Sequence, residues 1–558
     1  MTVTARRGTE LRCRNWRAEA LLRLLENVLE VGERPEELVV YASIGKAAKD
    51  WEAHRRIVDA LQHLGEDQTL VLQTGRPVAV LNTHAAAPMV VSAVNNTVGN
   101  WATEERFYSR LAEHKTIWGG LTAAAWQYIG RQGVLGGTYE LLRAALEKHF
   151  RESAAPHRWV LTAGLGGMGS SQPISARMLG LSTLVVEADP AKLAKLEAAG
   201  GIDLVLDDLD GALATISAAI TERRPVAVGL LGNAADVFPA VVASGARPDI
   251  VTDQTAAHDA RYGYLPSGYT LGSWAEARET DPEQVERDAR ASMAAQVRAM
   301  LALGQRGSVV FENGNNLRVQ ASHVLGETER QRVFAEIPGF MEGYLRPLFS
   351  RGIGPFRWMI LSGDDNDLAV VDDLAARMFP ERPEIARWIG LARRHIPAQG
   401  LPARSCWLGY GERSALALAV NEAVADGRIS APVAFSRDHL DSAGMTHPRI
   451  GTEGMRDDSD GVTDWPILDA MLLAAGGADL VAVHSGGGGY SGWMQSAGVT
   501  VVADGTGAAA TRLRQALDLD SGIGVIRHAT AGYEDALDAV QRSHEPGAHG
   551  APLNLIRN

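Results

Sequence analysis

The feature that most constrains the fold is a glycine-rich loop that directly follows a short apolar run. Residues 159–162 read WVLT and predict a buried strand, and residues 162–172 read TAGLGGMGSSQ before a helical pattern begins. Gly164, Gly166 and Gly169 have the G-x-G-x-x-G spacing, in which glycines allow a tight turn, close approach of a pyrophosphate and close helix packing. Amides at the start of a helix form an anion site. Strand, loop and helix in this order predict a Rossmann-type α/β unit.

An acidic residue lies where such a unit contacts a ribose. Glu187 lies near the end of the next predicted strand, 182–189, and follows Gly164 by 23 positions. A carboxylate at this place accepts hydrogen bonds from the ribose diol and favours NAD over NADP. Taken from these residues alone, a glycine-rich turn that only packs a helix on a sheet is the alternative.

The rest of the chain predicts a lobe inserted into another lobe. Short apolar runs at 227–232, 248–253 and 308–311 suggest further strands of the parallel sheet, and Asp281-Pro282 predicts the start of a long helix ending near Gly304. Strands and helices also alternate on both sides of this region. We therefore predict an α/β core lobe formed by residues 1–150 and 346–558, with a nucleotide-binding domain at 151–345.

Composition excludes several classes of protein. A chain of 558 residues is too long for one hydrophobic core, and its two cysteines, Cys13 and Cys406, exclude a disulfide framework and an iron–sulfur cluster held by this chain. The net charge of -13 and the lack of a long basic tract argue against nucleic acid as a partner. No leader-like or membrane-spanning apolar stretch is visible, so we expect a cytoplasmic protein.

The glycine loop also carries a resemblance to a known family. The string TAGLGGMGSSQP at 162–173 resembles the signature of urocanase (urocanate hydratase). The likeness continues along nearly the whole chain, in YIGRQGVLGGTYE (128–140), VTDQTAAHDARYGYLPSG (251–268), FENGNN (311–316), RGIGPFRWMILSGD (351–364), QGLPARSCWLGYGER (399–413), SAPVAFSRDHLDS (430–442) and ADGTGAAATRLR (503–514). The resemblance implies a homodimeric hydro-lyase that holds NAD+ tightly and uses it as an electrophile, without net redox change.

The resemblance also implies a set of cofactor contacts. We expect NAD+ to be bound by the loop and its flanks, that is by Gln132, Gly164, Gly166, Gly167, Met168, Gly169, Glu187, Asn233, Ala234, Gln254, Thr255, Ala256, Ala257, His258, Tyr264, Leu265 and Gly488. Four expected contacts depart from the family, which commonly has two glycines at Ala42 and Ser43, an arginine at Lys192 and a tyrosine at Asn313. Lysine keeps the charge of arginine but loses its planar fork.

Candidate catalytic residues follow from the same likeness. Cys406 matches the active-site cysteine of the family, although a lone buried cysteine is more often inert. Asp438, His439 and Asp441 follow an apolar strand, and we expect Asp441 or Asp438 to donate a proton with His439 as helper. The alternative is a loop whose aspartates cap a turn or face water.

Arginine and histidine supply the remaining candidates. Arg357, between Phe356 and Trp358, is the best match for clamping the substrate carboxylate, with a surface salt bridge as the alternative. His258 and His484 have no companions at metal-ligand spacing, so we expect no metal site and interpret them as hydrogen-bonded or cofactor-contacting histidines.

Two stretches near the expected substrate differ from the family. A Pro-x-Arg-Glu-Thr-Glu stretch is usual after the DHLD motif, whereas this chain reads HPRIGTEG with Arg449 and Ile450. Two histidines before a triple glycine are also usual, whereas this chain has His484 and Ser485, four glycines, and then Tyr490, Trp493 and Met494. Because buried polar groups that lack partners reject substrate analogues, these changes predict a different imidazole substrate.

Sulfur packs well against methionine and aromatic side chains, so we hypothesise a 2-thio or S-methylthio urocanate. The enzyme would then act in the degradation of histidine or ergothioneine. Plain urocanate remains an alternative, as does drift in a loop outside the pocket. An ordinary NAD-dependent dehydrogenase or an NAD-sensing binding protein would also explain the glycine loop alone.

Overall fold

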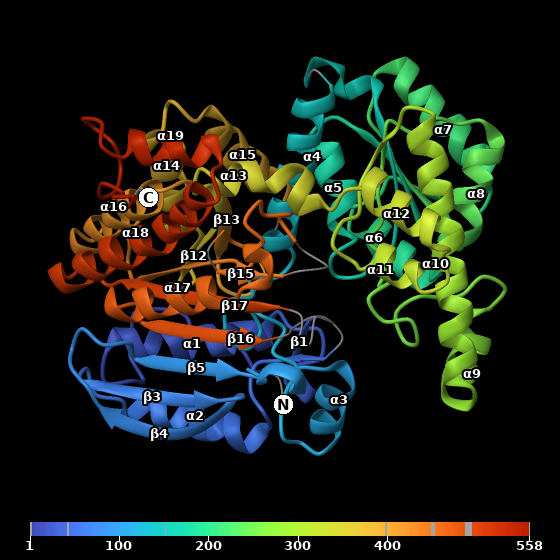
Figure 1. Ribbon diagram of the computed structural model, residues 1–558. Helices are drawn as coiled ribbons and strands as arrows, with labels where there is room; N and C mark the ends of the chain where they lie inside the picture. Colours follow the sequence, from blue (N-terminus) through green and yellow to red (C-terminus); the bar gives the residue numbers. More distant parts are fainter. Residues whose placement is uncertain are drawn as a thin grey trace. The chain divides into compact units, whose positions relative to one another are not determined.

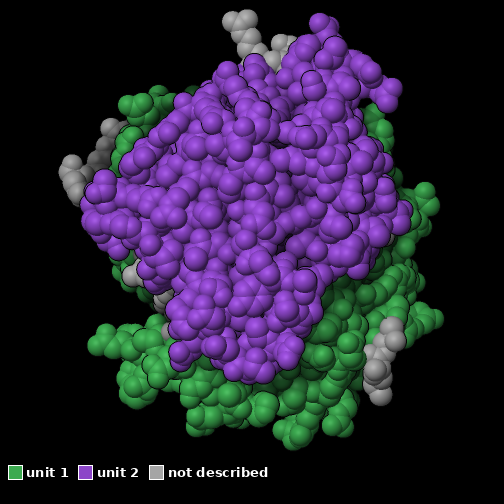
Figure 2. All heavy atoms as spheres, turned by 90° about the vertical axis from the view of Figure 1, so that its right-hand side faces the viewer, with its two compact units in different colours: residues 1–133, 346–448, 454–558 green, residues 134–345, 449–453 purple. Residues whose placement is uncertain are grey.

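The computed structural model describes residues 3–41, 44–150, 152–396, 399–442, 444–447, 452–485 and 494–556. The chain divides into two compact units (Figure 2). Unit 1 comprises residues 1–133, 346–448 and 454–558, and unit 2 comprises residues 134–345 and 449–453. The boundaries expected from the sequence were 150/151 and 345/346. The mixed α/β class with a Rossmann-like domain is confirmed.

Unit 2 contains a six-stranded sheet in which all neighbouring strands are parallel, in the order β11-β10-β6-β7-β9-β8. Its strands are β6 (Trp159–Ala163), β7 (Ser182–Glu187), β8 (Leu204–Leu206), β9 (Ala227–Leu231), β10 (Ile250–Val251) and β11 (Val309–Val310). Its helices are α5 (Ser171–Met178), α6 (Pro190–Ala198), α7 (Leu209–Glu222), α8 (Ala234–Ser244), α9 (Leu271–Thr280), α10 (Pro282–Gln305), α11 (Leu317–Ser322) and α12 (Glu327–Glu336) (Figure 1). Helix α4 (Arg131–His149) runs across the division between the units.

Local sequence signals explain several of these elements. Strands β6 and β7 are buried along their whole length, as expected for parallel strands covered on both faces. The predicted long helix is confirmed as α10, and the side chain of Asp281 caps it by accepting from the backbone nitrogen of Gln284. Proline then occupies its first turn, where no intrahelical N–H bond is lost.

Unit 1 contains a nine-stranded sheet in which β13-β12-β14-β17-β16-β5-β3-β4 follow one another and β15 pairs with β17. Its strands are β3 (Gln68–Gln73), β4 (Arg76–Asn82), β5 (Val90–Val94), β12 (Gly354–Ile360), β13 (Ala403–Leu408), β14 (Val433–Arg437), β15 (Met445–Thr446), β16 (Leu480–Ser485) and β17 (Gln495–Ala503). A separate antiparallel pair joins β1 (Val39–Tyr41) and β2 (Gly45–Lys46). The pairs β16–β5 and β3–β5 are parallel, and the other pairs are antiparallel.

Helices cover both faces of this sheet (Figure 1). The helices of unit 1 are α1 (Trp16–Glu30), α2 (Trp51–His63), α3 (Glu104–Ala112), α13 (Arg346–Phe349), α14 (Asp365–Met378), α15 (Pro383–His395), α16 (Glu412–Ala425), α17 (Asp464–Ala475), α18 (Gly507–Thr530) and α19 (Glu534–Arg542). Leucines of α1 pack on Leu480, Val502 and Ala434 of one face. Helices α16, α17 and α18 pack on β14, β16 and β17 from the other. No described helix is both long enough and apolar enough to span a membrane.

Candidate functional site

The glycine loop of unit 2 lies where the strand order of the parallel sheet reverses. β6 has β7 on one side and β10 on the other, so the loop after β6 opens at a topological switch point, the usual ligand site of such sheets. Gly164 has φ +87°, and a Cβ there would lie 2.5 Å from the carbonyl oxygen of Gln254. A Cβ at Gly169 would lie 2.0 Å from the carbonyl oxygen of Gly164. These two glycines are therefore required by the packing of the protein itself.

Gly166 differs from its two neighbours in this respect. A Cβ at Gly166 would meet no atom within 4 Å, and Met168 beside it is 44% exposed. Among the described residues, no acceptor receives a hydrogen bond from the backbone amides of Gly166, Gly167, Met168 or Gly169. Successive free amides before a helix suit an anion. The space and the donors of this loop thus fit the pyrophosphate of a dinucleotide.

Glu187 is held rigidly at the end of β7. Its two carboxylate oxygens accept hydrogen bonds from the backbone nitrogens of Leu165 at 2.7 Å and Asp189 at 3.0 Å. Lys192 Nζ lies 3.7 Å from Glu187 Oε1. Glu187, the expected ribose contact, is thereby fixed beside the glycine loop. Lys192, another expected cofactor contact, lies next to it.

Asn233 occupies the turn after β9. Its side chain caps α8 by accepting from the backbone nitrogen of Ala235 at 2.9 Å, and its Nδ2 donates to the carbonyl oxygen of Leu265 at 3.0 Å. Ala234 is buried at the first turn of α8. One asparagine thus ties the segment containing Leu265 to the strand end.

The segment after β10 is fixed by a buried carboxylate. Asp253 accepts hydrogen bonds from Thr255 Oγ1 at 2.6 Å, from Gln296 Nε2 at 2.9 Å and from the side chain of Asn315. Burial is the largest influence on its pKa and raises it to about 6, although these hydrogen bonds act in the opposite direction. Tyr264 is buried and donates to Gln296 Oε1 at 2.7 Å, so the same network reaches it.

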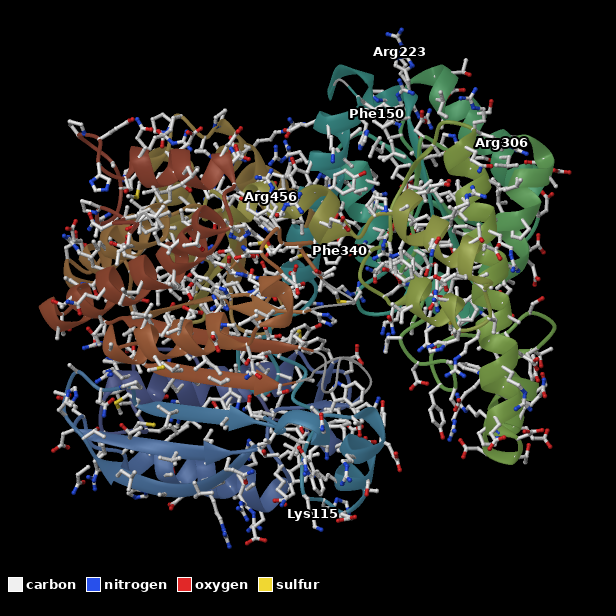
Figure 3. The ribbon with its side chains drawn as sticks, in the orientation of Figure 1. Lys115, Phe150, Arg223, Arg306, Phe340 and Arg456 are labelled. Atoms are coloured by element: carbon white, nitrogen blue, oxygen red, sulfur yellow. The ribbon has the colours of Figure 1, made fainter. Side chains whose placement is uncertain are left out.

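The neighbouring turn at 312–316 is packed from one side by Phe340, which Figure 3 labels. A Cβ at Gly314 would lie 2.7 Å from Phe340 Cε1, and Gln254 Nε2 donates to the carbonyl oxygen of Asn313 at 2.6 Å. Ala256 and Ala257 precede His258, whose pKa is lowered mainly by burial. The described unit 2 residues among the expected cofactor contacts therefore lie at the end of β7, in the first turns of α6 and α8, and in the segments that follow β6, β9, β10 and β11.

Three of the expected cofactor contacts, Ala42, Ser43 and Gly488, lie outside the described residues. Gln132 lies in unit 1, is 3% exposed, and its Oε1 has no hydrogen-bond partner in the described structure. A buried acceptor without a donor is costly, which is compatible with a ligand contact there.

A second group of candidate residues lies on one face of the sheet in unit 1. Directly opposed residues of paired strands point to the same face. Arg357 of β12 is opposed to Ser436 of β14, Ser436 to Thr500 of β17, and Ser496 of β17 to His484 of β16. Thr500 and Ser496 are four residues apart on one strand, so all five side chains share one face, which we term the polar face.

Arg357 is held on the polar face by several groups. Its Nη2 pairs with Asp438, its Nη1 donates to the carbonyl oxygen of Gln127 at 2.8 Å, and Nε is buried without a partner among the described residues. A Cβ at Gly133 would lie 2.8 Å from Nη2, so only glycine fits above the guanidinium. Arg357 therefore does not form a surface salt bridge. Asp438 occupies one of the guanidinium donors, Nη2.

His439 lies in the same place and is fully buried. Its Nε2 is 2.9 Å from Gln127 Oε1, its Nδ1 is 3.3 Å from Ser496 Oγ, and its ring meets that of His484 edge-on with centroids 4.9 Å apart. Burial, followed by electrostatic interactions with His484, Arg437 and Arg357, lowers the pKa of His439 well below its usual value. Burial lowers the pKa of His484 to about 3, so both imidazoles are neutral at physiological pH.

Asp441 points into a different environment. Its Oδ2 is 2.7 Å from Arg413 Nη1 and 3.8 Å from Arg437 Nε, and all three side chains are buried. Burial alone would raise the pKa of Asp441, but the two guanidinium groups outweigh it and lower the pKa. A carboxylate held ionised in this way is poorly suited to donate a proton. The geometry therefore favours a positioning role for Asp441 and leaves Asp438 beside Arg357.

Arg413 and Arg437 also bind two further aspartates. Asp520 of α18 lies 3.2 Å from Arg413 and 2.9 Å from Arg437, and Asp469 of α17 lies 2.6 Å from Arg437. We term Arg413, Arg437, Asp441, Asp469 and Asp520 the buried charge cluster. It has two positive groups and three carboxylates, and burial together with the charge of Asp520 raises the pKa of Asp469 well above its usual value.

Cys406 faces away from the polar face. It is opposed to Phe356 on β12, whereas Arg357 is opposed to the adjacent Ser405. Because neighbouring residues of a strand alternate between faces, Cys406 and Arg357 lie on opposite faces of the sheet. The thiol is 2% exposed. The structure thus places the family-matched cysteine among the packing of Phe356 and not beside Arg357 and Asp438.

Six residues in two stretches were expected to determine substrate specificity, and two of them, Ser485 and Met494, are described. Arg449, Ile450, Tyr490 and Trp493 lie outside the described residues. Ser485 ends β16, and its carbonyl oxygen accepts from Asn95 Nδ2 at 3.0 Å. Met494, just before β17, is buried. Ser485 and Met494 therefore lie at the ends of two adjacent strands, close in sequence to His484 and Ser496.

Two residues that contact His439 were not predicted from the sequence, namely Gln127 and Ser496. Neither belongs to a motif of recognisable spacing. The only available signal for Gln127 was its position directly before the family-like stretch that begins at Tyr128. Among the described residues there is no group of three or more His, Cys, Asp or Glu side chains suited to a metal ion.

The fold and the glycine loop define an α/β protein with a dinucleotide-binding type of domain inserted in a second unit. Comparison with known families matches the urocanase N-terminal domain to residues 3–127, the urocanase Rossmann-like domain to 130–344 and the urocanase C-terminal domain to 347–542. The chain belongs to the urocanase family and is a hydro-lyase, as the resemblance implied.

Individual proteins that match the chain include an enzyme of known name and a solved structure. S-methyl thiourocanate hydratase of Variovorax sp. (strain JCM 16519 / RA8) is 49% identical over 534 residues, which cover 96% of this chain and 95% of that protein. Shikimate dehydrogenase of Mycobacterium tuberculosis matches 37% of this chain and 58% of its own with 14% identity and a TM-score of 0.16, a likeness too weak to support any inference.

Proposed function

We propose that the protein adds water to S-methyl thiourocanate, with thiourocanate and plain urocanate as poorer substrates. The observation that carries the proposal is the 49% identity to an S-methyl thiourocanate hydratase along 96% of the chain. The departures from plain urocanase around Ser485 and Met494 support the same substrate, because thioether and aromatic groups suit sulfur.

The cofactor we propose is NAD+. Free amides at Gly166–Gly169, the open space at Gly166 and the fixed carboxylate of Glu187 support this assignment in unit 2. When bound, NAD+ supplies an electron-poor pyridinium ring that withdraws electrons from an imidazole. Homodimeric assembly is part of the proposal through the family resemblance, and a cytoplasmic location is part of it as expected from the sequence.

The chain's own residues would orient the substrate and move protons. Arg357 has one buried Nε–H left to donate and is proposed to bind the acrylate carboxylate. Asp438 contacts one guanidinium group, whereas Asp441 contacts two and is more deeply buried, so Asp438 is the proposed proton carrier. His439, His484 and Ser496 are proposed to exclude bulk water and to fix the geometry near this pair.

The test follows the conjugated chromophore of three substrates side by side. Purified protein is mixed with S-methyl thiourocanate, thiourocanate or urocanate, and the fall in absorbance is recorded. We expect the fastest conversion with the S-methylthio compound and no accumulation of reduced nicotinamide. Equal or faster conversion of plain urocanate would contradict the substrate, and reduced nicotinamide formed in step with turnover would indicate a dehydrogenase. NAD+ released by denaturing gel-filtered protein would support a tightly held cofactor.

A further inference from the structure

Gln127 contacts both Arg357 of the polar face and His439, two residues that lie far apart in the sequence. It is 0% exposed, and its backbone nitrogen donates to the carbonyl oxygen of Thr122 at 2.8 Å, which closes the turn before α4. Its carbonyl oxygen accepts from Arg357 Nη1, and its side chain contacts His439. One residue therefore contacts both the arginine and the histidine.

The orientation of the Gln127 amide follows from its other contacts. Nε2 lies 2.7 Å from the carbonyl oxygen of Val499 and 3.1 Å from Thr500 Oγ1. A carbonyl oxygen can only accept, so the nitrogen of the amide must face β17 and the oxygen must face His439. Because Oε1 has no proton to give, the His439 Nε2 that lies 2.9 Å away must carry one.

The other ring nitrogen then follows by elimination. A neutral imidazole with its proton on Nε2 has a lone pair on Nδ1, which accepts from Ser496 Oγ at 3.3 Å. We propose that Gln127 is a positioning residue that holds His439 as a neutral imidazole protonated on Nε2. His439 is then a fixed hydrogen-bonding group on the polar face and does not deliver a proton to substrate.

The charged surroundings of His439 agree with this assignment. Arg437 precedes it on β14, Arg357 faces it from β12, and the ring of His484 meets it from β16. Asp438 is the adjacent carboxylate, but it pairs with Arg357. A third positive charge in a fully buried site would be unfavourable. Burial and these cations therefore favour the neutral imidazole of His439, as the hydrogen bond to Gln127 does.

Gly498 completes the arrangement from the other side of the ring. A Cβ at Gly498 would lie 2.4 Å from His439 Nε2, although the backbone there needs no left-handed conformation. Gly498→Ala should therefore displace the imidazole from Gln127 with little strain of its own strand. This gives a variant that disturbs the same contact without altering the glutamine.

Neutron diffraction from deuterium-exchanged crystals of the wild-type protein tests the tautomer directly. We expect a deuteron on His439 Nε2 and none on Nδ1. A deuteron on Nδ1, or on both nitrogens, would overturn the proposal. This readout needs no turnover, so it stands even if the proposed substrates are not converted and the proposed function fails.

The pH dependence of turnover tests the positioning role and rests on the proposed function. In Gln127→Glu, a carboxylate beside Nε2 favours the imidazolium and raises the pKa of His439. We expect kcat to fall on the acid side through a new ionisation that the wild type lacks, and to return to within about tenfold of wild type at alkaline pH. Loss by the same factor at every pH would mean that Gln127 only packs.

A double-substitution cycle provides the matched control. Gly498→Ala and Gln127→Glu act on one contact, so their effects on kcat should be less than additive. Fully additive effects would contradict a shared action on His439. If Gln127→Glu fails to fold, the neutron map of the wild type still decides the tautomer.

Discussion

Asp441 Oδ2 lies 2.7 Å from Arg413 Nη1, and both side chains are almost completely buried. Arg413 comes from α16, whereas Asp441 belongs to the loop after β14. The pair therefore fastens the loop that carries Asp438 and His439 to the helix behind the sheet. This relationship gives Asp441 a function in placing that loop.

We predict that Asp441→Asn lowers kcat by less than about 100-fold, because removal of a general acid typically costs 10²–10⁴ in rate. Asparagine keeps an oxygen that can accept from Arg413, so the loop should stay close to its place. The pH profile of kcat should keep its shape. Steady-state kinetics from acid to alkaline pH check this, with Asp438→Asn as the matched control that we expect to lose much more activity. If Asp441→Asn loses more activity than this and its pH profile of kcat also lacks an ionisation that the wild type shows, Asp441 is the proton donor.

The buried charge cluster predicts opposite effects for two similar substitutions. Asp520 contacts both Arg413 and Arg437, so Asp520→Asn leaves buried positive charge poorly compensated and should cost about 3–5 kcal/mol of unfolding free energy. Asp469 is the carboxyl group whose pKa is raised, mainly by burial and then by Asp520. Asp469→Asn mimics its protonated form and should cost less than about 1 kcal/mol. Urea unfolding of both variants measures the difference.

The same raised pKa fixes the sign of a pH effect. A carboxyl whose folded pKa exceeds its unfolded value binds more protons in the folded state, so stability falls as pH rises from about 3.8 through the folded pKa. Asp469→Asn should remove this contribution, and its stability should depend less on pH than that of the wild type. An unchanged slope in the variant would show that Asp469 does not hold the extra proton.

Local signals in the sequence were sufficient for the nucleotide-binding unit. The turn at Gly164, the close packing at Gly169 and the cap at Asp281 depend on residues near one another, and the structure has all three. The site in unit 1 depends on distant pairs instead. Gln127 and His439 are 312 positions apart, and no periodicity or spacing connects them.

Two of the predicted catalytic residues, Asp441 and Cys406, lie in surroundings that the sequence did not indicate. Asp441 was placed near Asp438 by sequence, but its environment is set by Arg413 of α16. Cys406 was placed by family match, but the face that it occupies depends on its pairing with Phe356. A shift of one residue in that pairing would reverse the face, and a sequence without its partner strand cannot specify it.

The position of Cys406 leads to a prediction about its thiol. Because Cys406 lies on the face opposite Arg357, Cys406→Ala should keep bound NAD+ and retain kcat within about tenfold. The lost sulfur leaves a small cavity, so the unfolding free energy should fall by about 1 kcal/mol. Kinetics, cofactor content and thermal unfolding of one preparation measure all three. A loss of more than about 1000-fold in kcat in a folded, NAD-containing variant would place the thiol in the chemistry.

The glycine loop offers a comparison between cofactor binding and folding. Alanine at Gly166 would meet no atom of the protein within 4 Å, whereas alanine at Gly169 would press on the carbonyl oxygen of Gly164. We predict that Gly166→Ala changes the unfolding free energy of cofactor-free protein by less than about 0.5 kcal/mol but weakens NAD+ binding at least tenfold, because its methyl group fills the approach to the free amides. Gly169→Ala should instead cost about 1–3 kcal/mol even without cofactor. Calorimetric titration with NAD+ and urea unfolding of cofactor-stripped variants separate the two effects. Unchanged affinity in Gly166→Ala would show that the pyrophosphate does not approach this loop.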